Sequence, residues 1–252
     1  MSGPANERVR LTSYVISAPR SGMNWLRFCT EEFYGRRTPG KTSLIDRADD
    51  PGEAFLRSHD ALNWTRWPRR RSGGLWRYVD PEATAGDRVV LILRDPLETF
   101  VRAAGKRFWD FRFYAGNIRF YSRAAGEKAV FYYEDLVADP GTMADLLDFL
   151  QIAPAPGRTA PTRQEIAARW GELGAKSRAM YDTKQAVGGG SQTRHRPTDF
   201  RFHQKTLAEW EKDRVWRFLR HRLSAQELRL LDRYHPLATG APGWAERLRY
   251  WL

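Results

Sequence analysis

The strongest constraint on the fold is the stretch 14–28, which reads YVISAPRSGMNWLRF. It opens with three apolar residues, as a buried strand does. Residues 17–22 are small apart from one arginine, and their proline and glycine indicate a turn. Apolar residues then recur at helical spacing from Trp25. A strand, a tight loop and a helix N-terminus in succession form an anion site, because the first helical N–H groups lack partners and the helix dipole favours negative charge.

The loop also carries donors suited to a phosphate group. Arg20 supplies a positive charge, and Ser21 and Asn24 supply side-chain donors. The Walker A loop of ATP-binding proteins ends in Gly-Lys followed by Ser or Thr, and this stretch has no such ending. We therefore predict a phosphate cradle of another kind.

Three further apolar runs predict strands, at 54–56, 88–93 and 129–133. Helical patterns separate them, and the capping-box spacings Thr162/Glu165 and Ser224/Glu227 predict two later helices. This alternation predicts an α/β protein with a mostly parallel sheet that helices cover on both faces. The polar clusters at 19–24, 57–59 and 94–96 each follow a strand, so we expect them to meet at the carboxyl edge of the sheet.

Composition bounds the class of protein. The chain has 252 residues, of which 42% are hydrophobic, so it can build a substantial core and is not a disordered chain. We predict one domain over 1–252, with a flexible N-terminus at 1–11 and a mobile loop at 186–200 that contains three glycines. A net charge of +12 predicts attraction to polyanions.

Cysteine usage and hydropathy bear on location. A single cysteine, Cys29, excludes an intrachain disulfide and favours a reducing compartment. No long apolar run stands out, so we expect neither a signal peptide nor a membrane span. The predicted location is therefore cytoplasmic.

Four segments resemble motifs of the sulfotransferases that use 3′-phosphoadenosine 5′-phosphosulfate (PAPS). The segment P-R-S-G-x-x-W at 19–25 resembles their 5′-phosphosulfate loop, and Arg57-Ser58-His59 resembles their Lys-Thr-His. The segment 94–96 resembles the start of their 3′-phosphate site, and 133–136 resembles their Tyr-Glu-Asp-Leu segment. The resemblance spans about residues 12 to 152. It implies a P-loop-NTPase-like architecture and transfer of a sulfuryl group from PAPS, without a metal ion.

The resemblance also implies roles for individual residues. His59 would take the acceptor proton, Arg20 would stabilise the leaving 5′-phosphate, and Arg57 would lie beside the transferred group. The residues implied in nucleotide binding are Arg20, Ser21, Gly22, Met23, Asn24, Trp25, Arg94, Arg102, Tyr133, Arg194 and Arg196. Two interpretations stay open, because His59 can instead be structural and Trp25 can be a core residue rather than the stacking face for adenine.

The chain also departs from the family pattern. Met23 stands where the family has threonine, and Arg102 stands where it has serine. The C-terminal Arg-Lys-Gly segment that closes over the nucleotide is missing in that form, and 191–196 is the candidate substitute.

Other functions also remain possible from the sequence. A nucleotide-dependent phosphotransferase would use the same loop, although the Walker lysine is missing. A basic nucleic-acid-binding module would explain the net charge, although no zinc-finger, homeodomain or RNA-recognition signature is present. The acceptor is likewise open, with a glycan, an acidic peptide, a lipid or a small metabolite all compatible with the residues. No grouping has metal-ligand spacing.

Overall fold

The protein is described by a computed structural model over residues 12–36, 38, 45–46, 54–64, 77–184 and 206–234. Its centre is a four-stranded sheet in the order β3-β1-β5-β6, and every neighbouring pair is parallel. The strands are β1 (Ser13–Ser17), β3 (Leu56–Ser58), β5 (Arg88–Leu93) and β6 (Glu127–Tyr132). The protein is thus an α/β protein with an all-parallel sheet, as the alternation of patterns predicted.

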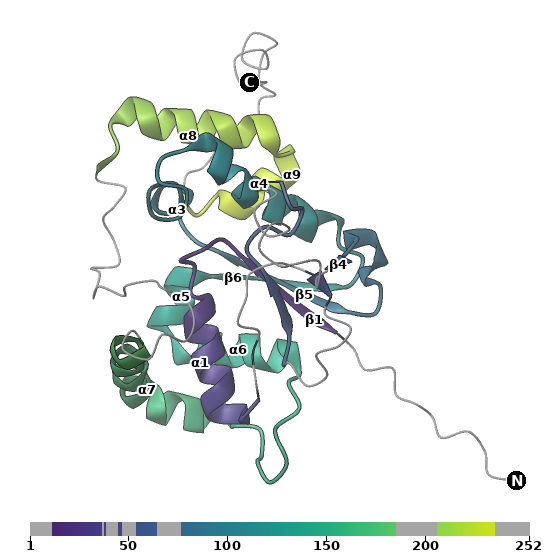
Figure 1. The fold of residues 1–252 in the computed structure, drawn as a ribbon, viewed down its shortest axis with the longest axis vertical. Coiled ribbons are helices and arrows are strands. Elements are labelled where there is room, and N and C mark those ends of the chain that lie inside the picture. Colours follow the sequence, from purple (N-terminus) through teal and green to yellow (C-terminus); the bar gives the residue numbers. More distant parts are fainter. Residues whose placement is uncertain are drawn as a thin grey trace, which may run out of the picture.

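Alternate residues of the central strands face two separate apolar layers. In β5, Leu91 packs in one hydrophobic cluster, whereas its neighbours Val90 and Ile92 pack in the other. Helices α3, α4, α8 and α9 lie on one side of the sheet, and α1, α5, α6 and α7 lie on the other (Figure 1). Burial on both faces explains why β5 is a continuous apolar run rather than an alternating one.

Helices lie between the strands and after the last of them. They are α1 (Met23–Tyr34), α3 (Pro96–Arg102), α4 (Phe108–Arg123), α5 (Tyr133–Ala138), α6 (Pro140–Leu150), α7 (Arg163–Lys184), α8 (Glu209–Arg222) and α9 (Ala225–Leu228), with short 3-10 turns η1 (Pro81–Thr84) and η3 (Arg229–Leu231).

Both predicted capping boxes are confirmed. The N–H of Thr162 donates to the Glu165 carboxylate at 2.7 Å, and the Thr162 hydroxyl accepts from the N–H of Glu165. In the same way the N–H of Ser224 donates to Glu227 at 2.7 Å, and the Ser224 hydroxyl accepts from the N–H of Glu227.

The structure corrects two predicted boundaries. The strand predicted to run through Tyr133 ends at Tyr132, and residues 133–135 form the first turn of α5. The strand predicted from the apolar run 54–56, with its tip at His59, begins only at Leu56, and His59 follows its last residue directly. A second, two-stranded sheet pairs β2 (Ile45–Asp46) antiparallel with β4 (Arg77–Tyr78).

Other predictions fall outside the described part of the chain. These are the flexible N-terminus at 1–11 and the loop at 186–200. Within the described ranges, no helix is both long and apolar enough to cross a membrane.

Candidate functional site: an arginine-lined helix N-terminus beside His59

The loop after β1 leaves the N-terminus of α1 uncapped. Gly22 occupies the N-cap with φ 85°, in the left-handed region, and no side chain caps the helix. The N–H groups at 23–25 have no backbone acceptor within the described chain, and the first turn holds no acidic residue. The Ser21 hydroxyl is fully buried and has no hydrogen-bond partner among the described residues. A buried donor without a partner costs free energy, so this group of donors suits an anion.

Tyr133 explains why residue 22 is glycine. A Cβ on Gly22 would lie 2.8 Å from Cδ2 of the Tyr133 ring, closer than side chains approach one another. The same ring lies 4.3 Å from the guanidinium carbon of Arg94, a cation–π contact. Tyr133 therefore packs against both the anion loop and the Arg94 segment, although it opens a helix rather than ending a strand.

Arg94 connects the end of β5 to the end of β1. Its side chain is buried, and Nη1 donates to the carbonyl oxygen of Arg20 at 2.6 Å. Its own carbonyl accepts from the Tyr114 hydroxyl at 2.6 Å. The positive φ of Arg20, 71°, is an uncommon conformation for a residue with a side chain, and this hydrogen bond helps to hold it. Arg94 thus positions the loop, which sequence reasoning did not predict.

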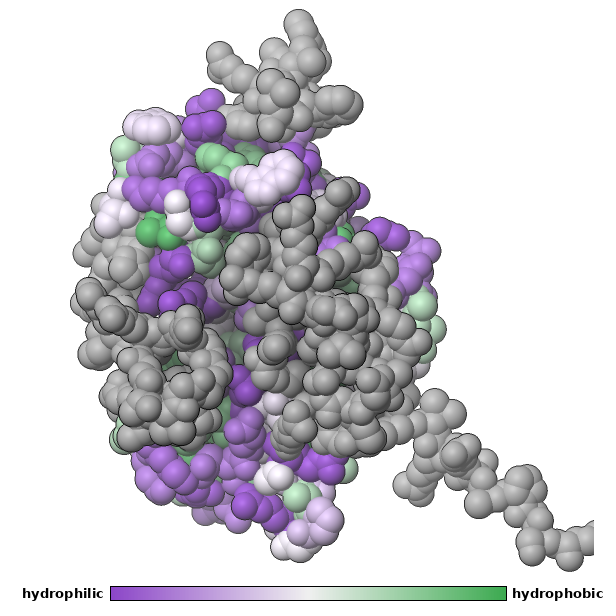
Figure 2. Space-filling view, in the orientation of Figure 1, coloured by the Kyte–Doolittle hydropathy of each residue, from purple (hydrophilic) through white to green (hydrophobic). Residues whose placement is uncertain are grey.

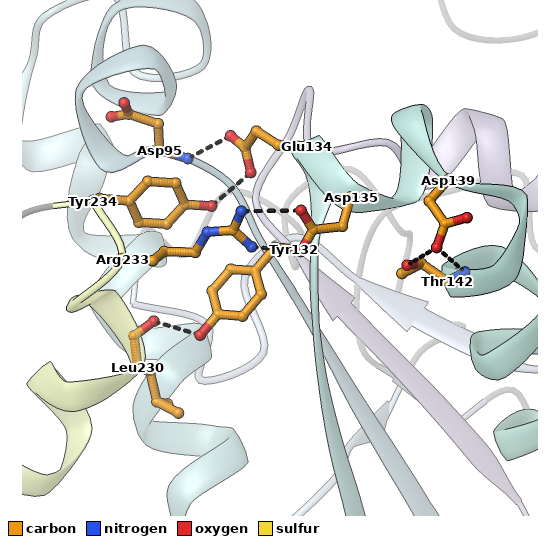
Figure 3. A network of polar contacts seen from close by, with 9 residues as sticks. All are labelled: Asp95, Tyr132, Glu134, Asp135, Asp139, Thr142, Leu230, Arg233 and Tyr234. Carbon is orange, nitrogen blue, oxygen red and sulfur yellow. Dashed lines mark hydrogen bonds and ion pairs between the residues drawn. The ribbon is translucent and has the colours of Figure 1, made fainter.

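A polar network anchors the next residue, Asp95 (Figure 3). The N–H of Asp95 donates to Glu134 at 3.2 Å, and Glu134 accepts a second bond from the Tyr234 hydroxyl at 2.7 Å. Arg233 donates to both carboxylate oxygens of Asp135, at 2.5 and 3.0 Å. The adjacent carboxylates 134 and 135 thus each bind a different residue of the segment that follows η3.

Three arginines make the site electropositive. Arg20 is exposed, and Arg102 of α3 is partly buried on the same side as Arg94. Burial and then the charge of Arg94 lower the pKa of Arg102, while Glu98 opposes this effect. Burial and then Arg94 also lower the pKa of Arg20. Mutual repulsion among these cations favours a bound anion.

His59 is held as a neutral imidazole with a defined tautomer. Its Nδ1 lies 2.8 Å from the carbonyl oxygen of Ser17 and 3.4 Å from the Ser17 hydroxyl. Because a carbonyl only accepts, Nδ1 must carry the proton and Nε2 must have its lone pair available. Burial, followed by the charge of Arg57, lowers the pKa of His59 to about 3, so the ring is neutral at physiological pH.

Asn117 of α4 holds the backbone around His59, and the sequence carried no signal for this role. It is 2% exposed, donates to the His59 carbonyl at 3.1 Å and accepts from the N–H of Ala61 at 2.9 Å. Only the tertiary structure brings these groups together, because His59 and Ala61 precede Asn117 by 58 and 56 residues. Asn117 therefore sets where the segment carrying His59 can lie.

The remaining predicted residues divide into three groups. Met23 is buried in the core beneath α1, and Asn24 is partly exposed in the first helical turn. Trp25 stacks on Phe28, and its Nε1 donates to the Leu136 carbonyl at 3.2 Å; these are core contacts, while adenine stacking stays a prediction. Arg194 and Arg196 lie outside the described residues.

Arg57 is buried in β3, level with Val15 of β1. With His59 beside Ser17 and Arg94 beside Arg20, the three polar clusters that follow β1, β3 and β5 lie together, as predicted.

The chain matches no model of a known protein family, and a search of curated proteins found no match. Among the described residues, no group of three or more histidine, cysteine, aspartate and glutamate side chains could hold a metal ion. The function is therefore argued from the site itself.

Replacing Gly22 tests the packing under Tyr133. Gly22→Ala should destabilise the protein more than Gly86→Ala, although the two glycines have nearly the same φ, 85° and 84°. The left-handed conformation costs each alanine about 1–2 kcal/mol. At Gly22 the collision with Tyr133 adds about 1–3 kcal/mol, whereas no atom lies within 4 Å of a Cβ on Gly86. Urea unfolding of both variants measures the difference, and equal losses would contradict the close approach.

Stability at acid pH tests the state of His59. Its folded pKa, about 3, lies below the ordinary value of 6.5, so the unfolded chain binds a proton that the folded chain refuses between these values. Stability is therefore fully present above pH 6.5 and is lost as pH falls toward 3. His59→Asn keeps a donor for the Ser17 carbonyl but does not titrate, so its melting temperature should fall less between pH 7.5 and 5. Asp95 changes stability in the opposite direction as pH falls, because burial raises its pKa to about 6. This contribution is the same in the wild type and in the His59→Asn variant, so it cancels in the comparison. Parallel pH curves would contradict a buried neutral His59.

Proposed function

We propose that this protein is a sulfotransferase that moves a sulfuryl group from PAPS to a hydroxyl or amine of an acceptor. The observation that carries the proposal is the contact of His59 Nδ1 with Ser17, which leaves Nε2 available at the start of the loop that leads to the uncapped N-terminus of α1. Transfer of this kind depends mainly on positioning and on stabilising charge, and the site provides for both. The buried, unpartnered Ser21 hydroxyl fits a 5′-phosphate oxygen, and Arg102 fits a second phosphate.

The residues of the site have separate roles in the proposed reaction. His59 accepts at Nε2 the proton of the attacking hydroxyl, whose oxygen forms the new bond to sulfur. The bond from sulfur to the 5′-phosphate oxygen breaks, and the electron pair remains on that oxygen. The N–H groups of α1, the Ser21 hydroxyl and Arg20 stabilise the charge there. The charge of Arg57 lowers the pKa of His59, and the negative charge of a bound nucleotide opposes this effect. Nucleotide binding therefore raises the pKa of His59 toward the range in which a base works at neutral pH.

Nucleotide binding tests the proposed site. Adenosine 3′,5′-bisphosphate should bind and raise the melting temperature. Arg20→Ala should weaken the binding of both this nucleotide and adenosine 5′-phosphate, because it removes a contact to the shared 5′-phosphate. Arg102→Ser should weaken only the bisphosphate, by about ten- to a hundredfold, since a hydrogen bond to a charged group contributes about 1.5–3 kcal/mol. Calorimetric titration of the four pairs measures this. If Mg-ATP binds more tightly than the bisphosphate, a phosphotransferase is the better interpretation.

Turnover tests the base. His59→Ala should leave the affinity for adenosine 3′,5′-bisphosphate nearly unchanged and reduce sulfate transfer by about a hundredfold or more, the usual effect of losing a general base. Transfer from radiolabelled PAPS to a panel of acceptors identifies the substrate and gives the rate. Wild-type turnover by the variant would mean that His59 is structural.

A further inference from the structure

A group of cations and indoles lies on α4, at the end of α8 and in the segment that follows β3. We call it the arginine–tryptophan cluster, and its members are Trp64, Trp109, Arg112, Arg119 and Arg222. Arg112 and Arg119 are seven residues apart on α4 and so lie on the same side of the helix. Arg222 is the last residue of α8 and lies near both arginines. Burial is the main cause that lowers the pKa of Arg222, and the charges of Arg112 and then Arg119 lower it further.

No carboxylate of the described residues neutralises these three arginines. The Nε atoms of Arg112 and Arg222 are buried without a hydrogen-bond partner in the described chain. Two other arginines of the same helices do pair with carboxylates. Arg123 of α4 pairs with Glu82 at 2.9 Å, and Arg217 of α8 pairs with Asp213 at 3.9 Å. Three like charges held close together, two of them partly buried, oppose folding, and an external anion would relieve that repulsion.

Two indole rings lie among the charges. Trp64 lies against Gly116, where a Cβ would be 3.2 Å from the ring, and Arg119 stands 5.6 Å from the ring centroid. Trp109 is 63% exposed, and the Arg112 guanidinium stacks on it at 3.7 Å. A ligand held here meets positive charge and flat apolar surface together.

Hydrogen bonds join the cluster to the His59 segment. The N–H of Trp64 donates to Asp60 at 2.9 Å, and Arg112 donates to the Trp64 carbonyl. Asn117, next to Gly116, donates to the His59 carbonyl at 3.1 Å. The cluster therefore lies alongside the segment that carries the proposed base.

We propose that the arginine–tryptophan cluster is the acceptor subsite and that it binds an acidic saccharide. This inference rests on the proposed function, which requires an acceptor that bears a hydroxyl. Carboxylate groups of such a saccharide pair with the guanidinium groups, bidentately where geometry permits. The C–H face of a sugar ring packs on an indole, and the many hydroxyls supply the nucleophile.

Direct binding tests the subsite without any turnover. The probe is a non-sulfated chondroitin hexasaccharide, titrated into the full-length protein by calorimetry at low salt. A neutral chitin hexasaccharide, a Glu/Tyr hexapeptide and oligothymidylate are the comparison ligands. The chondroitin probe should bind most tightly, and its affinity should fall as salt rises.

Matched variants locate the binding. Arg119→Gln and Arg222→Gln should each weaken chondroitin binding about tenfold, the effect of losing one charge-assisted contact. Arg123→Gln and Arg217→Gln remove the same charge from the same helices, at positions already paired with carboxylates, and should leave binding unchanged. Arg119 is exposed, so its variant should keep the wild-type melting temperature.

The outcomes separate this inference from the proposed function. Equal effects of all four variants would mean diffuse attraction and overturn the subsite. Tighter binding of the acidic peptide or of oligothymidylate would overturn the saccharide. Binding of adenosine 3′,5′-bisphosphate without chondroitin binding would overturn the subsite alone. Chondroitin binding that depends on the cluster, without nucleotide binding, would overturn the sulfotransferase and leave an acidic-saccharide site.

Discussion

The site depends on the hydrogen bonding of β1 along both of its edges. β1 pairs in parallel with β3 on one side and with β5 on the other, so the carboxyl ends of three strands emerge side by side. The anion loop, His59 and Arg94 come from segments separated by more than thirty residues in the chain, and this pairing alone brings them together. Burial of the sheet by helices on both faces then holds the strand ends in a fixed arrangement (Figure 1).

The loop is held in place by hydrogen bonds that link residues of several other segments. Arg94 bonds the Arg20 carbonyl, Tyr114 bonds the Arg94 carbonyl, and Glu134 bonds the N–H of Asp95. The left-handed conformation at Gly22 and the ring of Tyr133 above it determine where α1 begins. Such preorganisation matters because hydrogen-bond donors that are already oriented toward the anion position need no rearrangement when negative charge forms there during the reaction.

Helix α4 connects the two regions that we assign to catalysis and to the acceptor. Asn117 holds the backbone of the His59 segment, and the neighbouring turns carry Arg112 and Arg119. The surface in Figure 2 is largely hydrophilic where described residues are visible, with hydrophobic residues in small separate patches.

The sequence alone determined the class of fold and the local chemistry of the loop. The continuous apolar run 88–93 and the turn residues at 17–22 are local patterns, and local periodicity is enough to assign a buried strand and a tight turn. It also placed His59 at a strand end. It did not place the end of β6, because Tyr132 and Tyr133 suit a strand equally well and only the contact of Tyr133 with Gly22 and Arg94 distinguishes them. The tautomer of His59, the role of Arg94 as a support and the anchoring by Asn117 and Tyr234 depend on partners 42 to 100 residues away. Only tertiary packing determines such contacts, because residues far apart in the chain come within hydrogen-bonding distance only when the elements that carry them pack together.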